Sequence, residues 1–210
     1  IMERKGYVDK FEGDLIMAVW GVPFPVPDHA VQGCLAALEK LEALERLRPT
    51  LKTLFRTDID IRIGLNSGLV TAGNMGSDRR MQYTVVGEAV NFAARFETLN
   101  KEYGTRILIG EETRRQAGDA IDTRLVDEVV PKGSSRAVRI HELLGRRGQT
   151  DARRLNAARL YEAAWLAFQQ QDFTTAARHL EEALLIRPED GPAQILKSRI
   201  ATAAPAGFRT

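Results

Sequence analysis

Apolar and polar residues follow two different patterns along the chain. Up to about residue 144, runs with the two-residue period of β-strands are mixed with runs at helical spacing. Beyond residue 151 only the helical spacing recurs, and the polar stretch 145–151 separates the two patterns. We therefore divide the chain into a mixed part at residues 1–146, a helical segment at 147–204 and a tail at 205–210.

Several short runs in the mixed part are typical of strands. The clearest is 59–65, in which isoleucine or leucine occupies every second position. Residues 66–68, Asn-Ser-Gly, are expected to turn this strand back into 69–72 as a hairpin, followed by a polar connection at 73–80. The other expected strands are residues 7–11, 15–20, 82–86, 106–109, 123–129 and 138–144.

Runs at helical spacing lie between these strands. Asp28 is a candidate N-cap for the first helix. Its apolar stripe contains Val31, Cys34, Leu38, Leu41 and either Leu44 or Leu47. A second helix is expected from Glu88 and a short one at 111–116. Hairpins interrupted by helices predict an α+β sandwich, with helices packed on one mostly antiparallel sheet.

The helical segment has apolar faces at 161–168 and 173–186, and a third helix is expected at 193–203. Its second helix, with Asp172-Phe173 before it and Pro188 after it, resembles the second helix of a tetratricopeptide repeat. Because one repeat cannot bury its own face, the segment should dock on the mixed part, pair with another copy or continue a longer array. Binding of a protein partner is one interpretation, and a helical cap is the one we favour.

Composition excludes several classes of protein. The chain has 210 residues, of which 44% are hydrophobic and 28% charged, with a net charge of +2. This balance is typical of a globular protein, and the scattered basic residues do not favour nucleic acid as a partner. Cys34 is the only cysteine, so no internal disulfide forms and a reducing, cytoplasmic compartment is expected. The three histidines are scattered and do not have the spacing of metal ligands.

The longest apolar run, residues 15–26, is interrupted by glycine and prolines and is too short for a bilayer, which needs about 20 residues. Because the chain begins with Ile1, we expect it to be a fragment. A membrane anchor is then expected only in segments upstream of this chain.

The stretch 82–95 contains the strongest candidate chemistry. A short β-favouring run ends at Gly87, and a helix follows in which Asn91 and Arg95 lie four residues apart. They share the face nearly opposite the apolar stripe of that helix. An amide and a guanidinium held side by side at the end of a strand form a plausible pair for binding an anion.

Residues 83–95 resemble the signature of the class III nucleotide cyclases, the adenylate and guanylate cyclase homology domain. The resemblance extends from about Gly6 to Leu144 through several blocks in the family's order. It implies a ferredoxin-like core with extra strands, and it implies conversion of a nucleoside triphosphate to a cyclic nucleotide and pyrophosphate.

The resemblance also implies roles for individual residues. Asn91 matches the asparagine that orients the ribose, and Arg95 the arginine that stabilises the pentavalent phosphate. Lys10 and Thr84 match the base-reading pair, and a lysine with a threonine suits adenine, so the expected substrate is ATP. Asp14 matches one of two metal-binding aspartates, and Lys132 matches the lysine that meets the triphosphate. The cofactor is then Mg²⁺ or Mn²⁺, with two ions per site.

Some positions depart from the family pattern. Glu88 replaces a common aspartate, and Pro131 with residues 134–135 alters the loop around Lys132. The family's first metal aspartate has no match, which we interpret as truncation, so this chain alone is expected to be weakly active or inactive. The family also implies a homodimer with two active sites shared between the subunits. The alternatives are a guanylate cyclase, an inactive homologue acting as a regulatory or dimerisation module, and an interaction module dominated by the terminal helices.

Overall fold

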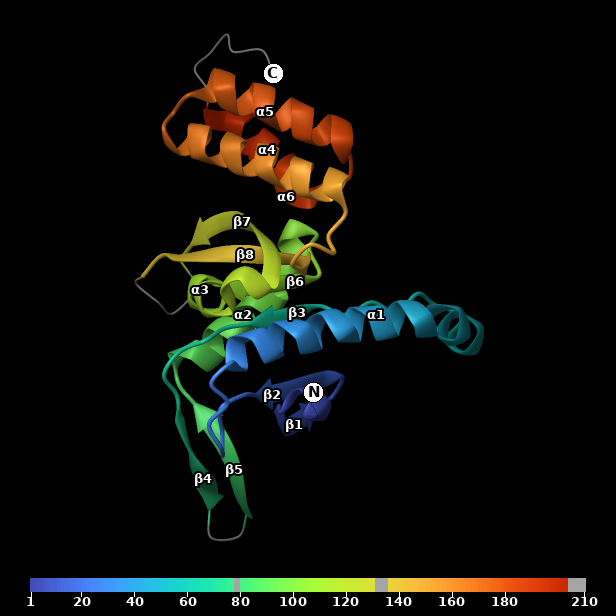
Figure 1. Ribbon diagram of the computed structural model, residues 1–210, viewed down its shortest axis with the longest axis vertical. Coiled ribbons are helices and arrows are strands. Elements are labelled where there is room, and N and C mark those ends of the chain that lie inside the picture. The colour runs from blue at the N-terminus through green and yellow to red at the C-terminus, as the bar shows by residue number, and fades with distance from the viewer. Residues whose placement is uncertain (78–79, 131–135, 204–210) are drawn as a thin grey trace.

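The computed structural model describes residues 1–77, 80–130 and 136–203 of the chain. Its elements form successive layers, with two β-hairpins at one end, helix α1 and a four-stranded sheet in the middle, and helices α4 to α6 at the other end (Figure 1). One hairpin joins β1 (Tyr7–Glu12) to β2 (Leu15–Val19), and the other joins β4 (Thr71–Ser77) to β5 (Arg80–Val86). Antiparallel strands with packed helices confirm the expected α+β class.

The central sheet has the strand order β3–β6–β8–β7. These strands are β3 (Ile63–Leu65), β6 (Ile107–Gly110), β7 (Ile121–Val129) and β8 (Val138–Arg146). Strand β3 runs parallel to β6, and the other pairs are antiparallel. Helices α1 (His29–Phe55) and α3 (Glu111–Ala117) contribute to the core on one face, and α2 (Glu88–Tyr103) packs on the other. Single turns of 3-10 helix lie at Met2–Arg4 and Gly118–Ala120.

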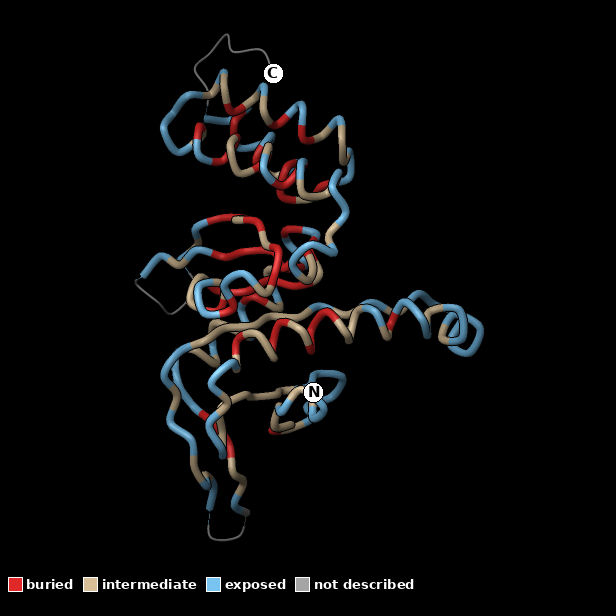
Figure 2. The backbone as a smooth tube through the Cα atoms, viewed as in Figure 1, coloured by how far each residue is buried: buried red, intermediate tan, exposed pale blue. Residues whose placement is uncertain are grey.

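Strand β6 shows why helices cover both faces of this sheet. Ile107 and Ile109 belong to the core formed with α1, whereas Leu108 belongs to the core formed with α2. All three side chains are fully buried, and Figure 2 shows buried residues in the central sheet, along α1 and in the terminal helices. Alternate residues of a strand point to opposite faces, so a continuous apolar run needs a cover on each side.

Helix α1 begins directly after Asp28, as the sequence predicts. The Asp28 carboxylate does not cap the backbone, because its Oδ2 accepts from the side-chain Nε2 of Gln32 at 2.5 Å. Leu44 is buried and Leu47 is exposed, so the apolar stripe follows Leu44. No helix in the described part of the chain is both long and apolar enough to cross a bilayer.

Two local predictions for residues 59–80 are wrong. The predicted strand 59–65 is reduced to β3, which pairs with β6 and forms no hairpin with 69–72. The predicted polar connection at 73–80 lies largely within β4, which pairs with β5 from Thr71 opposite Val86 to Ser77 opposite Arg80. Long-range pairing outweighs local turn chemistry here, since strand formation depends strongly on context.

Helices α4 (Ala152–Gln169), α5 (Phe173–Ile186) and α6 (Gly191–Ala203) share one apolar core and dock on β7. The Tyr161 hydroxyl of α4 donates to the Val126 carbonyl at 2.5 Å, and Glu162 Oε1 accepts from the Leu125 amide at 2.6 Å. Side chains of α4 therefore satisfy backbone groups that an edge strand leaves unpaired. Of the three arrangements expected for the helical segment, the structure shows docking, and the tetratricopeptide interpretation stays a prediction.

A buried charge network fastens the helical segment to the sheet. Arg124 on β7 donates through Nε to Glu142 Oε2 at 2.7 Å and through Nη1 to Asp190 Oδ1 at 2.9 Å. Its guanidinium also lies 5.2 Å from the centre of the Tyr161 ring. Because removing one partner of a buried pair leaves an uncompensated charge, this network favours a single docked arrangement.

One face of α6 holds the C-terminal end of α2. Gly191, Ile195 and Arg199 recur every four residues and therefore lie on the same face of the helix. Ile195 packs against the core that contains Phe96 and Tyr103 of α2. Arg199 Nη1 lies 2.5 Å from Asp127 Oδ2 on β7, and its Nη2 donates to the Tyr103 hydroxyl at 3.3 Å. Helix α6 thus couples the terminal segment to the helix that carries Asn91 and Arg95.

We expect Gly191→Ala to destabilise the fold. A Cβ atom at Gly191 would lie 2.0 Å from the Tyr103 carbonyl oxygen, so α6 must move away from α2. Such overpacking typically costs about 1–3 kcal/mol, which urea denaturation measures as a lower unfolding free energy. Lys197→Ala, at an exposed position of the same helix, is the control and should leave the midpoint nearly unchanged. Equal unfolding free energies for Gly191→Ala and the unmodified chain would contradict close packing of α6 on α2.

His141 makes the stability of the fold depend on pH. Its ring is buried on β8 with Nε2 2.5 Å from Glu111 Oε2, and burial lowers its pKa from 6.5 to about 4 even though Glu111 acts in the opposite direction. The unfolded chain therefore takes up the proton first, and stability falls as pH falls below about 6.5. Between about pH 6.5 and 5 the loss should be on the order of 2 kcal/mol. The variant His141→Gln retains a hydrogen-bond donor for Glu111. Its unfolding free energy, measured by urea denaturation, should depend less on pH than that of the unmodified chain. An identical dependence would show that His141 is not its cause.

Candidate active site

Helix α2 presents Asn91 and Arg95 on its outer face. Strand β5 leads through Gly87, which has a φ of 154°, directly into this helix, and both side chains are exposed. Neither side chain forms a hydrogen bond or ion pair with another described residue. The sequence-predicted pair is therefore brought together on an open surface, where its donors are available to an anion.

The opposite side of α2 is fixed tightly to β3. A Cβ atom at Gly64 would lie 2.0 Å from the Ala93 carbonyl oxygen and 2.4 Å from the Glu97 nitrogen, so the two backbones approach as closely as a glycine allows. The buried Asn100 amide donates to the Ile63 carbonyl at 3.0 Å and to the Phe96 carbonyl at 2.8 Å. These contacts determine which face of α2 is left open.

Lys10 and Thr84 are brought together by a residue that the sequence analysis missed. Thr84 Oγ1 donates to Asp9 Oδ2 at 3.0 Å, and Lys10 Nζ lies 3.4 Å from the same oxygen. The side chain of Asp9 is fully buried, Thr84 is buried, and Lys10 is about one-third exposed. A lysine donor and a threonine hydroxyl therefore lie on strands of two different hairpins, joined by one carboxylate.

A β-bulge explains why Asp9 escapes a sequence analysis. In a regular strand, adjacent residues point to opposite faces, so Asp9 and Lys10 would be separated. Here the register of β1 shifts between Val8, opposite Ala18, and Lys10, opposite Met17. The extra residue lets the Asp9 carboxylate contact both Thr84 and Lys10. An aspartate before the lysine is visible in the sequence, but the bulge is not.

The two hairpins are joined by two further hydrogen bonds and one ring contact between β1 and β5. The Gln82 amide donates to the Asp9 carbonyl at 3.2 Å, and the Tyr7 hydroxyl donates to the Tyr83 carbonyl at 3.3 Å. The Tyr7 and Tyr83 rings also meet edge to face, with centres 6.1 Å apart. The base-reading positions implied by the resemblance thus lie in a packed junction between two hairpins.

Asp14 is exposed in the turn between β1 and β2, after Gly13 with a φ of 61°. It lies outside both strands, so Asp14 and Lys10 of β1 do not share one strand face. No group of three or more acidic, histidine or cysteine side chains among the described residues can hold a metal ion. These residues alone do not form a complete site for Mg²⁺ or Mn²⁺, and Asp14 is a single candidate ligand. Lys132 lies outside the described residues.

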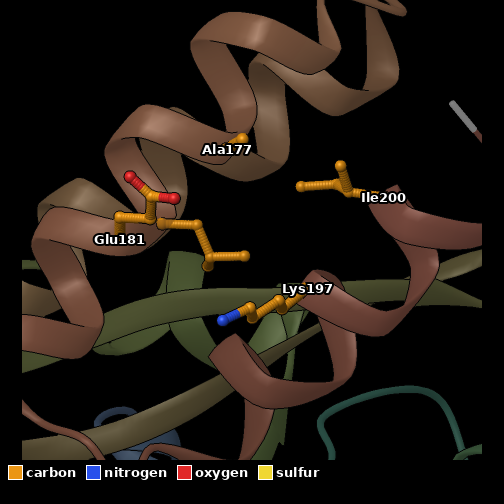
Figure 3. Close-up of a pocket in the computed structure, with 5 residues that line it drawn as sticks. Ala177, Glu181, Lys197 and Ile200 are labelled. Carbon is orange, nitrogen blue, oxygen red and sulfur yellow. The ribbon is translucent and has the colours of Figure 1, made fainter. Parts of the chain in front are cut away.

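A small pocket between α5 and α6 is separate from these residues (Figure 3). It is lined by Ala177, Leu180, Glu181, Lys197 and Ile200. Its cavity volume of about 10 Å³ is close to the smallest space that holds one water molecule. It is therefore far too small for a nucleotide.

The amino-acid sequence is similar to those of known proteins. Residues 1–143 match the family described as the adenylate and guanylate cyclase catalytic domain. A relative from Dictyostelium discoideum, "Adenylate cyclase, terminal-differentiation specific", is 33% identical over 204 residues. The aligned region covers 95% of this chain but only 9% of that relative's length.

Solved structures show the same similarity. The adenylyl cyclase CyaB from P. aeruginosa matches with a TM-score of 0.64 and 31% identity, covering 71% of this chain and 77% of that one. The guanylate cyclase domain of RhGC from Catenaria anguillulae, in complex with GTP, matches with a TM-score of 0.59 and 31% identity, covering 70% and 76% of the two chains. Both nucleotide specificities are therefore represented among the structural neighbours.

Gly64→Ala should impair the site through the position of α2. The added methyl group forces α2 away from β3, and a displacement of about 1 Å at catalytic groups can cost about 100-fold in rate. The measurement is turnover of nucleoside triphosphate by the complete natural protein, with thermal unfolding recorded in parallel. Gly73→Ala, whose added Cβ meets no atom within 4 Å, is the matched control and should retain activity. Equal activity of the Gly64→Ala protein would show that α2 does not need this contact.

Proposed function

The chain belongs to the adenylate and guanylate cyclase catalytic domain family, and on this premise we propose that it acts in an adenylate cyclase. The proposed reaction converts ATP to 3′,5′-cyclic AMP and pyrophosphate. The observation that supports adenine as the base is the junction at Asp9, where Lys10 and Thr84 contact one carboxylate oxygen. The Dictyostelium relative and the P. aeruginosa structure, both named as adenylate cyclases, support the same proposal.

The reaction is an in-line displacement at the α-phosphorus. The ribose 3′-oxygen loses its proton and forms a bond to phosphorus, while the bond to the pyrophosphate oxygen breaks. Such a reaction needs correct orientation of the attacking oxygen and stabilisation of the developing phosphorane charge. We assign the first task to the Asn91 amide and the second to the Arg95 guanidinium, both of which are exposed on α2. Lys132 is proposed to meet the triphosphate.

Lys10 and Thr84 are proposed to read the base. A lysine only donates hydrogen bonds, whereas a threonine hydroxyl both donates and accepts. The adenine edge offers an acceptor at N1 beside a donor at the 6-amino group, which matches this pair. The signal-transduction role carried by cyclic AMP follows from the proposed product.

We propose that the active sites form between two copies of the chain, with Asp14 of one copy facing the partner's Asn91 and the partner's Arg95. Asp14 supplies one ligand for Mg²⁺ or Mn²⁺ in this arrangement. Large apolar side chains exposed at or beside the two hairpins support a partner surface, since exposed apolar patches often mark interfaces. They are Phe11, Leu15, Ile16, Leu69, Met81 and Val86.

Arg95→Ala should lower the rate of cyclic AMP formation by the complete natural protein. Removing one group that stabilises transition-state charge typically costs about 100- to 1,000-fold in kcat, with a smaller change in KM. Lys101→Ala removes another exposed cation from α2 and should leave kcat unchanged. Cyclic nucleotide formation from ATP and from GTP, measured separately, also distinguishes an adenylate from a guanylate cyclase. Unchanged turnover by Arg95→Ala, or an unmodified protein inactive with both nucleotides, would overturn the proposal.

A further inference from the structure

The buried carboxylate of Asp9 is a costly group in the place where it lies. One oxygen, Oδ2, accepts from Thr84 and lies near Lys10, whereas Oδ1 has no hydrogen-bond partner among the described residues. An unsatisfied buried acceptor is unfavourable, and a link between two hairpins does not require an ionised group. The position of Asp9 therefore points to a role beyond packing.

The carboxylate determines which hydrogen-bonding role Thr84 can play. An ionised carboxylate only accepts hydrogen bonds, so the Thr84 hydroxyl proton must point toward Asp9 Oδ2 at 3.0 Å. The proton is then committed, and the remaining lone pairs of Thr84 Oγ1 can only accept. With a neutral amide at position 9, the hydroxyl could reverse and donate outward.

The same oxygen also holds Lys10 next to Thr84. Lys10 Nζ lies 3.4 Å from Asp9 Oδ2, and Lys10 retains other protons to donate. Adenine presents an acceptor at N1 and a donor at its 6-amino group, which complement a donor beside an acceptor. Guanine presents the reverse, a donor at N1 and an acceptor at O6.

We propose that Asp9 is a specificity-determining positioning residue, which fixes Thr84 as an acceptor beside the Lys10 donor and so selects a 6-amino purine over a 6-oxo purine. This inference rests on the proposed function, because it assumes that Lys10 and Thr84 face the base. Asp9 itself does not touch the nucleotide. It acts through the hydroxyl that it orients.

The test compares kcat/KM for ATP and for GTP in the complete natural protein and its Asp9→Asn variant. The asparagine amide can donate to Thr84 and release the hydroxyl proton toward the base. We expect the ratio of kcat/KM for ATP to that for GTP to fall by about tenfold or more. A site whose polar groups hydrogen-bond one substrate strongly rejects an analogue that leaves them unpaired. Glu12→Gln, which neutralises an exposed carboxylate of the same strand, is the matched control and should keep the ratio.

A purely structural role predicts a different result. If Asp9 only holds the two hairpins together, Asp9→Asn lowers kcat/KM for ATP and for GTP in proportion and leaves their ratio unchanged. That result overturns the inference, while the adenylate cyclase proposal stands. An unmodified protein without cyclase activity on either nucleotide refutes the proposed function itself. The two failures are therefore distinguishable.

Variants at Thr84 decide the question if Asp9→Asn does not fold. Thr84→Ser keeps the hydroxyl and its bond to Asp9, so the preference for ATP should remain. Thr84→Val keeps the shape but removes the acceptor, so the preference should fall. Retention of the full ATP preference by Thr84→Val would overturn the inference. Where both Asp9→Asn and Thr84→Val fold, the double variant should have the same ATP-to-GTP ratio as Thr84→Val alone, because Asp9 acts only through the Thr84 hydroxyl.

Discussion

The close approach of α2 to β3 is the constraint on which the rest of the site depends. Gly64 leaves room for the α2 backbone at a distance that any side chain would block, and the Asn100 amide fastens the helix to the same strand. With one side fixed in this way, Asn91 and Arg95 must face outward. The proposed anion-binding groups are therefore positioned by the core rather than by a loop, which favours precise geometry.

The terminal helices extend this constraint to the far end of α2. Gly191 lies against the Tyr103 carbonyl, and Arg199 reaches both Tyr103 and Asp127. Contacts of α4 with β7 and the buried Arg124 network hold the same helices on the sheet. The helical segment is thus a structural part of the unit that carries the candidate site, and α6 contacts α2 directly at Tyr103.

The sequence predicts local elements better than it predicts their partners. The strand, glycine and helix around Gly87 are readable because propensity, turn chemistry and helical spacing agree there. The pairing of β3 with β6, and the extension of β4 through residues 73–77, depend on distant segments and were predicted wrongly. Asn91 and Arg95 are recognisable by their spacing in the sequence. The contact of Asp9 with Thr84 is visible only in the structure, because it depends on a β-bulge in β1. Such a register shift leaves no periodic signal.

We propose above all that α2 presents Asn91 and Arg95 to Asp14 of a second copy. The most direct measurement mixes two inactive variants of the complete natural protein, Asp14→Ala and Arg95→Ala, and records cyclic AMP formation. In a shared-site dimer, each mixed pair contains one site with neither substitution, so an equal mixture should regain about one quarter of the unmodified activity. A mixture that forms mixed dimers and yet stays inactive would contradict the account.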